Sequence, residues 1–96
     1  MRPSAVLAAH RARVIALATA RGARSVRVFG SVARGEDREG SDIDLLIDMP
    51  PGTSLLQVVG LQFDLEDALG ARVDLCTERE LEPTLRHRIL AEARAL

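Results

Sequence analysis

The chain has 96 residues, of which 47% are hydrophobic and 28% are charged, and its formal net charge is −1. This size predicts a single domain over residues 1–96, and the composition excludes a disordered chain. The near-neutral charge and the absence of Tyr and Trp argue against direct nucleic-acid binding, which needs a basic surface or stacked aromatic rings.

The first half of the chain predicts a helix, a strand and a short second helix. Apolar residues at helical spacing predict a helix from about Ala5 to Ala20, with Ser4 as its N-cap. Alternating apolar residues predict a strand from Arg24 to Phe29 that ends at Gly30. Residues 31–35 are expected to form a short helix, and residues 36–40 (EDREG) an exposed loop.

The second half continues with strand, helix, strand and helix. The clearest strand is predicted over residues 41–49, before a turn at Pro50-Pro51-Gly52. Thr53 or Ser54 is expected to cap a helix that runs to about residue 69, and residues 72–77 (RVDLCT) predict a short strand. Pro83 suits the first turn of a last helix. The order predicts an α/β (α+β) fold with a small mixed sheet of about three strands, flanked by helices.

The single cysteine, Cys76, cannot form an internal disulfide, and with only two histidines it cannot complete a zinc cage. We interpret Cys76 as a small apolar strand residue, and His10 and His87 as surface or packing residues. No apolar run reaches the roughly 18 residues that span a bilayer. No early segment has the order of a signal peptide, so a reducing cytoplasm is the expected location.

Two carboxylates, Asp42 and Asp44, lie two positions apart on the clearest predicted strand, so their side chains leave the same face of the sheet. Carboxylates so placed repel each other unless a cation lies between them. Hard oxygen ligands of this kind suit Mg²⁺ or Mn²⁺ together with substrate phosphate oxygens. Asp74, in the middle of a second apolar strand, is the candidate for a third carboxylate facing the same metal.

A phosphate-binding turn is predicted upstream of the aspartates. Gly30-Ser31 follows a strand and opens a helix, where backbone N–H groups bind phosphate and glycine permits a close approach. The Ser31 hydroxyl adds a donor, and Arg34, with Arg38 a weaker candidate, is positioned to contact the phosphates. A phosphate cradle that faces a metal-binding carboxylate pair predicts a nucleoside triphosphate site.

The spacing of these residues resembles a known family. Gly30-Ser31, ten residues and then Asp42-Ile43-Asp44 is similar to the signature of the DNA polymerase beta-like nucleotidyltransferases. The longer stretch GSVARGEDREGSDIDLLID resembles the minimal nucleotidyltransferases, small prokaryotic proteins, and the resemblance covers nearly the whole chain. It implies the nucleotidyltransferase fold, in a single minimal nucleotidyltransferase domain.

The resemblance also implies an activity. Such proteins use Mg²⁺ to transfer AMP from ATP, and many are antitoxins that adenylylate a tyrosine of a helical HEPN-domain ribonuclease toxin. Asp42, Asp44 and Asp74 then match the catalytic and metal-binding carboxylates. Gly30 and Ser31 match the triphosphate-binding turn, and Arg34 falls in the common GSxARG form. Since the chain contains no tyrosine, the acceptor tyrosine is expected on a partner, in a hetero-oligomer with the toxin.

Two alternatives stay open at this point. One is a non-catalytic antitoxin that neutralises its toxin by direct binding, although binding alone needs no metal site. The other is an adenylyltransferase for a small molecule of the aminoglycoside type. Whether the chain modifies a protein partner or only binds it, we expect an exposed apolar patch on the first or last helix to dock that partner.

Overall fold

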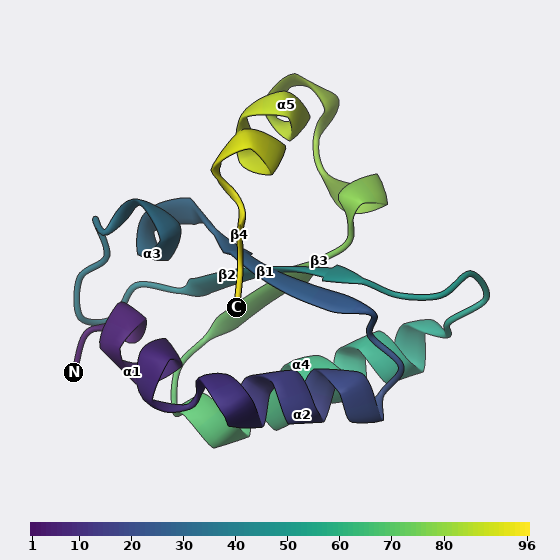
Figure 1. Cartoon of the computed structure of the whole chain (residues 1–96), viewed down its shortest axis with the longest axis horizontal. Helices are drawn as coiled ribbons and strands as arrows, with labels where there is room; N and C mark the ends of the chain where they lie inside the picture. The colour runs from purple at the N-terminus through teal and green to yellow at the C-terminus, as the bar shows by residue number, and fades with distance from the viewer.

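A computed structural model describes all 96 residues, and Figure 1 shows its arrangement. The strands are β1 (Ser25–Phe29), β2 (Ile43–Asp48), β3 (Val73–Cys76) and β4 (Arg94–Ala95). They form one mixed sheet in the order β3-β2-β1-β4, in which β2 and β3 are parallel and β1 is antiparallel to both of its neighbours. The predicted mixed α/β fold is confirmed. The two-residue strand β4 is an addition to the three strands expected.

The helices are α1 (Pro3–Ala9), α2 (Arg11–Ala20), α3 (Gly30–Arg34), α4 (Leu55–Leu69) and α5 (Pro83–Glu92), with the 3-10 turn η1 (Glu78–Glu80) before α5. The prediction of one first helix capped by Ser4 was wrong. The helix breaks at His10 into α1 and α2, and Pro3 opens α1 with Arg2 as its N-cap. Ser54, one of the two expected residues, caps α4 by accepting the Gln57 N–H.

The main core lies on one face of the sheet, under α2 and α4, which pack against each other (Figure 1). The alternation of β2 builds this core, because every second residue of the strand is fully buried there. The residues concerned are Ile43, Leu45 and Ile47. No helix of the chain has the length and apolar character that crossing a membrane would require.

A smaller apolar cluster covers part of the opposite face. Phe29 and Leu46 pack there with Leu81, and the end of α5 rests on them through Ile89 and Leu90. The face of the sheet that carries the aspartates is therefore covered by this small cluster and by α5, a helix that has no buried residue of its own.

The sequence suggested an exposed apolar patch on the first or last helix. In the structure, large exposed apolar side chains gather on α4 instead. Four of them lie in its first nine residues, namely Leu55, Leu56, Val59 and Phe63. On α5 only Leu85 is comparable. The expected location of the apolar patch was wrong because α4 turns its other side, with Leu61 and Leu65, into the core.

The loop over residues 36–40 was expected to be exposed, and at Asp37 this was wrong. The Asp37 residue is only 3% exposed. Its carboxylate accepts the Ser4 N–H at 2.8 Å and the Arg2 guanidinium at 3.0 Å, so it ties the loop to the start of α1. The Ser4 N–H is the main reason that the pKa of Asp37 is lowered, although its burial opposes that change.

This contact predicts that Asp37→Ala lowers the melting temperature by about 5 °C or more, the usual scale for one lost interaction of about 1 kcal/mol in a domain of this size. Because the pKa of Asp37 is lower in the folded chain, its contribution is present at neutral pH and fades as acid protonates the carboxylate. Thermal unfolding at pH 7 and pH 3 measures both effects. Glu39→Ala, in the same loop but exposed, is the control and should change little.

Candidate active site

The turn between β1 and α3 requires glycine for two separate reasons. Gly30 has a φ of +74°, in the left-handed region that disfavours side chains. A Cβ placed on Gly30 would lie 2.1 Å from Oδ2 of Asp44, far inside any allowed contact. The Gly30 backbone therefore packs directly against the Asp44 carboxylate, and the predicted phosphate turn and the predicted metal ligand touch each other.

The sheet register brings two of the three predicted carboxylates side by side, and the third lies close to them. Asp44 lies beside Asp74 in the parallel β2–β3 pair and opposite Phe29 in the β1–β2 pair. Adjacent strands lie about 4.8 Å apart, so Asp44 and Asp74 are close neighbours on one face. Asp42 comes just before β2 and forms a 3.8 Å ion pair with Arg72. The expected pairing of the two aspartate-bearing strands is confirmed, while the catalytic roles stay predictions.

Negative charge accumulates around Asp44. Its pKa is raised from 3.8 to about 6, first because the carboxyl group is partly buried and then because Asp74 and Asp42 lie nearby. Arg34 opposes this effect, and Glu92 adds to it. A carboxylate held among other carboxylates is the setting in which a divalent cation is most favourable.

As the side chains stand, no group of three His, Cys, Asp or Glu residues is placed to hold a metal ion. Asp44 is half-buried, whereas Asp42 and Asp74 are exposed. Mg²⁺ commonly binds through one or two carboxylates together with substrate phosphates, and not in an all-protein cage. Three carboxylates, two of them exposed, beside the predicted phosphate-binding turn fit that kind of site, and the assignment of Asp42, Asp44 and Asp74 as ligands stays a prediction.

Ser31 and Arg34 follow Gly30 on α3. The backbone N–H groups of Ser31 and Val32 have no hydrogen-bond partner in the chain, so both remain available for an anion. Arg34 is already engaged, because its guanidinium contacts Glu36 at 2.8 Å and Glu92 at 3.0 Å. These two carboxylates, Glu36 first, raise the pKa of Arg34 further above its usual value. Arg38 is exposed and makes no ion pair.

Sequence reasoning missed Glu92, the last residue of α5. Its carboxylate accepts the Gly30 N–H at 2.9 Å and the Arg34 guanidinium at 3.0 and 3.2 Å. Burial opposes ionisation of Glu92, but these two donors outweigh it and lower its pKa. A glutamate 62 residues from its partner, at the end of an exposed helix, carries no local signal that could have revealed the contact.

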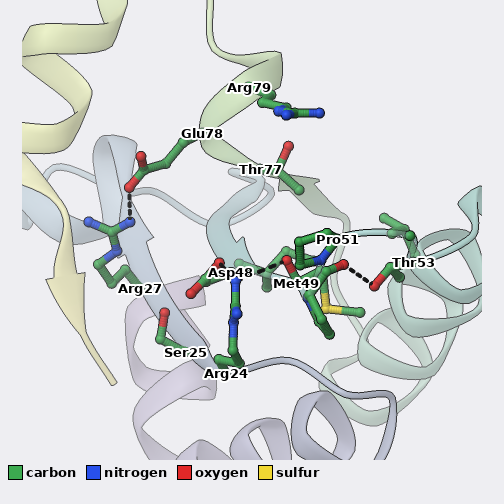
Figure 2. Close-up of a pocket in the computed structure, with 14 residues that line it drawn as sticks. Arg24, Ser25, Arg27, Asp48, Met49, Pro51, Thr53, Thr77, Glu78 and Arg79 are labelled. Carbon is green, nitrogen blue, oxygen red and sulfur yellow. Dashed lines mark hydrogen bonds and ion pairs between the residues drawn. The ribbon is translucent and has the colours of Figure 1, made fainter.

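A polar cavity of about 620 Å³ lies at the other end of β1 and β2, away from the aspartates (Figure 2). Arg27 reaches Glu78 at 2.7 Å across it, and Arg24 reaches Asp48 at 3.0 Å. Arg79 also lines it. Asp48 ends β2 here and lines this cavity, apart from the group formed by Asp42, Asp44 and Asp74.

Comparison with known proteins gives the same family from sequence and from structure. A family model described as a nucleotidyltransferase domain matches residues 16–96. A Methanocaldococcus jannaschii relative, named as a putative protein adenylyltransferase, is 42% identical over 84% of this chain and 87% of its own. The protein adenylyltransferase MntA of Thermococcus cleftensis is 42% identical over 74% of this chain and 72% of its own.

Two solved structures illustrate the likeness in fold. One, described as a putative minimal nucleotidyltransferase, has a TM-score of 0.86 and 49% identity, and the match covers 97% of this chain and 95% of that one. A toxin–antitoxin crystal structure with AMP-PNP has a TM-score of 0.75 over 88% of this chain and 69% of that one. At 22% identity the second match shows the shared fold alone.

The contact between Gly30 and Asp44 predicts that Gly30→Ala lowers the free energy of unfolding by about 1–3 kcal/mol more than Gly35→Ala does. Gly35 is a matched control, because its φ is +72° but an added Cβ would meet nothing within 4 Å. Urea unfolding of both variants measures the difference. In an Asp44→Ala background the excess should largely disappear, and an unchanged excess would contradict the assigned contact.

The raised pKa of Asp44 predicts that Asp44→Asn stabilises the metal-free protein at alkaline pH. Since the folded pKa is about 6 and the ordinary value is 3.8, the cost of ionising Asp44 is complete above pH 6 and absent below pH 4. At pH 8 we expect a gain of about 1–2 kcal/mol, after allowance for the partial exposure of this group.

Urea unfolding of wild type and Asp44→Asn between pH 4 and pH 8, without divalent cations, measures this gain. The advantage of the variant should shrink as the pH falls from 6 to 4. Asp67→Asn removes an exposed carboxylate of α4 and serves as the control. Equal stability of wild type and Asp44→Asn at pH 8 would contradict the electrostatic description of the site.

Proposed function

Because the chain belongs to the nucleotidyltransferase domain family, we propose that it is a protein adenylyltransferase antitoxin. In this proposal it transfers AMP from ATP to a tyrosine of a partner HEPN-type ribonuclease toxin and thereby silences that toxin. The observation that carries the proposal is the contact of the Gly30 turn with Asp44, beside Asp42 and Asp74. The relatives named as protein adenylyltransferases support transfer to a protein.

The nucleotide would lie across the Gly30 turn. The free N–H groups of Ser31 and Val32 and the Ser31 hydroxyl face an incoming phosphate as donors, and Arg34 adds charge. Mg²⁺ (or Mn²⁺), held by Asp42, Asp44 and Asp74, would neutralise phosphate charge when bound. The exposed Asp74 leaves room beside Asp44 for an acceptor hydroxyl.

In the proposed reaction the tyrosine oxygen attacks the α-phosphorus of ATP. The new oxygen–phosphorus bond forms as the bond from the α-phosphorus to the oxygen that bridges it to the β-phosphorus breaks, and pyrophosphate leaves in line. Asp74 accepts the proton of the acceptor hydroxyl, directly or through water. All of this takes place on the open face of the sheet, so a large protein acceptor can reach it. ATP as substrate agrees with the expected cytoplasmic location.

Two alternatives make different predictions. An antitoxin that acts by binding alone has no use for clustered carboxylates that raise the pKa of Asp44 and cost stability. An aminoglycoside-type enzyme would transfer AMP to a small molecule in the absence of a partner protein. The fold alone is compatible with each of these chemistries, so the test must follow the AMP group.

The proposal predicts that the purified chain, with ATP and Mg²⁺, adds the mass of one or more AMP residues to the helical ribonuclease encoded beside it. Mass spectrometry of the intact partner measures the addition, and peptide mapping locates the tyrosine. Asp42→Asn and Asp44→Asn should each lower the rate by about a hundredfold or more, and EDTA should abolish it. Asp67→Asn, exposed on α4, should transfer at the wild-type rate.

Neutralisation of the toxin in cells separates the alternatives. If Asp42→Asn and Asp44→Asn still silence the toxin fully, direct binding is sufficient and the catalytic proposal is wrong. If the purified chain modifies an aminoglycoside and leaves the partner protein unmodified, the small-molecule alternative replaces it.

A further inference from the structure

The end of α5 reaches into the phosphate-binding turn. Glu92 takes the Gly30 N–H with Oε2 at 2.9 Å and the Arg34 guanidinium with both carboxylate oxygens, at 3.0 and 3.2 Å. The Glu92 side chain is 18% exposed and the Arg34 side chain is 38% exposed, so the contact is only partly shielded from solvent. Arg34 is the cation that the proposed nucleotide site uses, and the Gly30 N–H belongs to the turn across which the nucleotide would lie.

A carboxylate in this position imitates a phosphate group. It presents two anionic oxygens to one backbone N–H and one guanidinium, which is the way phosphate oxygens are commonly bound. A phosphate that took the same two donors would have to occupy the same space. It would also meet the negative charge of Glu92, which is close enough to Asp44 to raise the pKa of that group.

We propose that Glu92 is a placeholder that occupies the phosphate-binding turn in the nucleotide-free protein and that the phosphates of the incoming nucleotide displace it. This inference rests on the proposed function, since it assumes that the turn binds a nucleoside triphosphate. It assigns to α5 a role in setting nucleotide affinity, because a phosphate that takes the Gly30 N–H and Arg34 must first break the contacts of Glu92.

The construction of α5 permits such a displacement. The helix has no buried residue, and it rests on the sheet mainly through the half-buried Ile89 and Leu90. After Glu92 the chain enters strand β4, which pairs with Arg27 and Val28 of β1, and Leu96 packs against the main core. A turn of the Glu92 side chain, or a local shift of the last turn of α5 that leaves β4 and Leu96 in place, therefore frees both donors without unpacking the main core.

A purely structural role for Glu92 makes the opposite prediction. If its carboxylate only satisfies the Gly30 N–H and orients Arg34, its loss disorders the turn and weakens nucleotide binding. If Glu92 competes with phosphate, its loss frees both donors and strengthens binding. A third possibility, simple repulsion between Glu92 and the nucleotide, depends on charge and not on contact.

Three variants distinguish these cases. Glu92→Gln removes the charge, whereas Glu92→Asp keeps the charge but is one methylene too short to reach the Gly30 N–H from the same backbone position. Glu82→Gln, at the exposed start of α5, is the matched control for the loss of one carboxylate from this helix. Thermal unfolding of each variant verifies that it is folded.

Calorimetric titration with ATP and Mg²⁺ gives the dissociation constant of each protein. We expect Glu92→Gln and Glu92→Asp both to bind about three- to tenfold more tightly than wild type, the size of effect of one charge-assisted contact, and Glu82→Gln to bind like wild type. Weaker binding by both Glu92 variants would overturn the proposal in favour of the structural role. Tighter binding by Glu92→Gln alone would overturn it in favour of charge repulsion.

Hydrogen exchange of the wild-type chain tests the displacement without any substitution. Saturating ATP and Mg²⁺ should speed amide exchange in the last turn of α5, and unchanged or slower exchange there would contradict displacement. The outcomes also separate the two proposals. Wild-type binding of ATP without tightening in the Glu92 variants overturns this inference alone. The absence of ATP binding in wild type and in Glu92→Gln overturns the proposed function and this inference with it.

Discussion

The close approach of Gly30 to Asp44 is the constraint on which the candidate site depends. A single added carbon on Gly30 would lie 2.1 Å from the carboxylate, so the backbone of one strand end and the side chain of its neighbour share a space that only glycine leaves open. The antiparallel register that places Phe29 opposite Asp44 fixes this approach. The predicted phosphate-binding turn and the carboxylates are thereby joined by a direct contact across the β1–β2 pair, which does not depend on the loop over residues 36–40 that connects them in sequence.

The clustering of these carboxylates destabilises the folded chain, and burial of apolar residues elsewhere in the fold offsets this loss. Asp44, Asp42 and Asp74 repel one another, and the raised pKa of Asp44 records this repulsion and the partial burial of the group. The opposite face of the same strand compensates, because Ile43 and Leu45 are fully buried against α2 and α4. Because one face of β2 is fixed in the core, the side chains on its other face are also held in position. This rigidity keeps the mutually repelling carboxylates from moving apart.

The sequence predicts those parts of the molecule that follow from local pattern. The alternation in residues 41–49 indicates β2. The apolar neighbours of Asp74 indicate a second strand, β3, which pairs with β2 in the structure. The parts that it does not predict depend on contacts between distant residues. Asp37 lies in a loop of polar composition and is buried only because α1 begins beside it. Strand β4 is two residues long and has no periodicity of its own, so only its pairing with β1 reveals it.

Glu92 shows why the geometry of a site cannot be assembled from its motif alone. The motif supplies the donors, Gly30 and Arg34, but it contains nothing that says whether they are free. In the folded chain a carboxylate from the far end of the sequence satisfies both. The donors of Ser31 and Val32 remain open. The turn is thus half-filled by the protein's own anion. In the proposed site the affinity for a nucleotide would be set by the difference between the free energies with which phosphate and Glu92 bind the same donors, and not by the strength of either interaction alone.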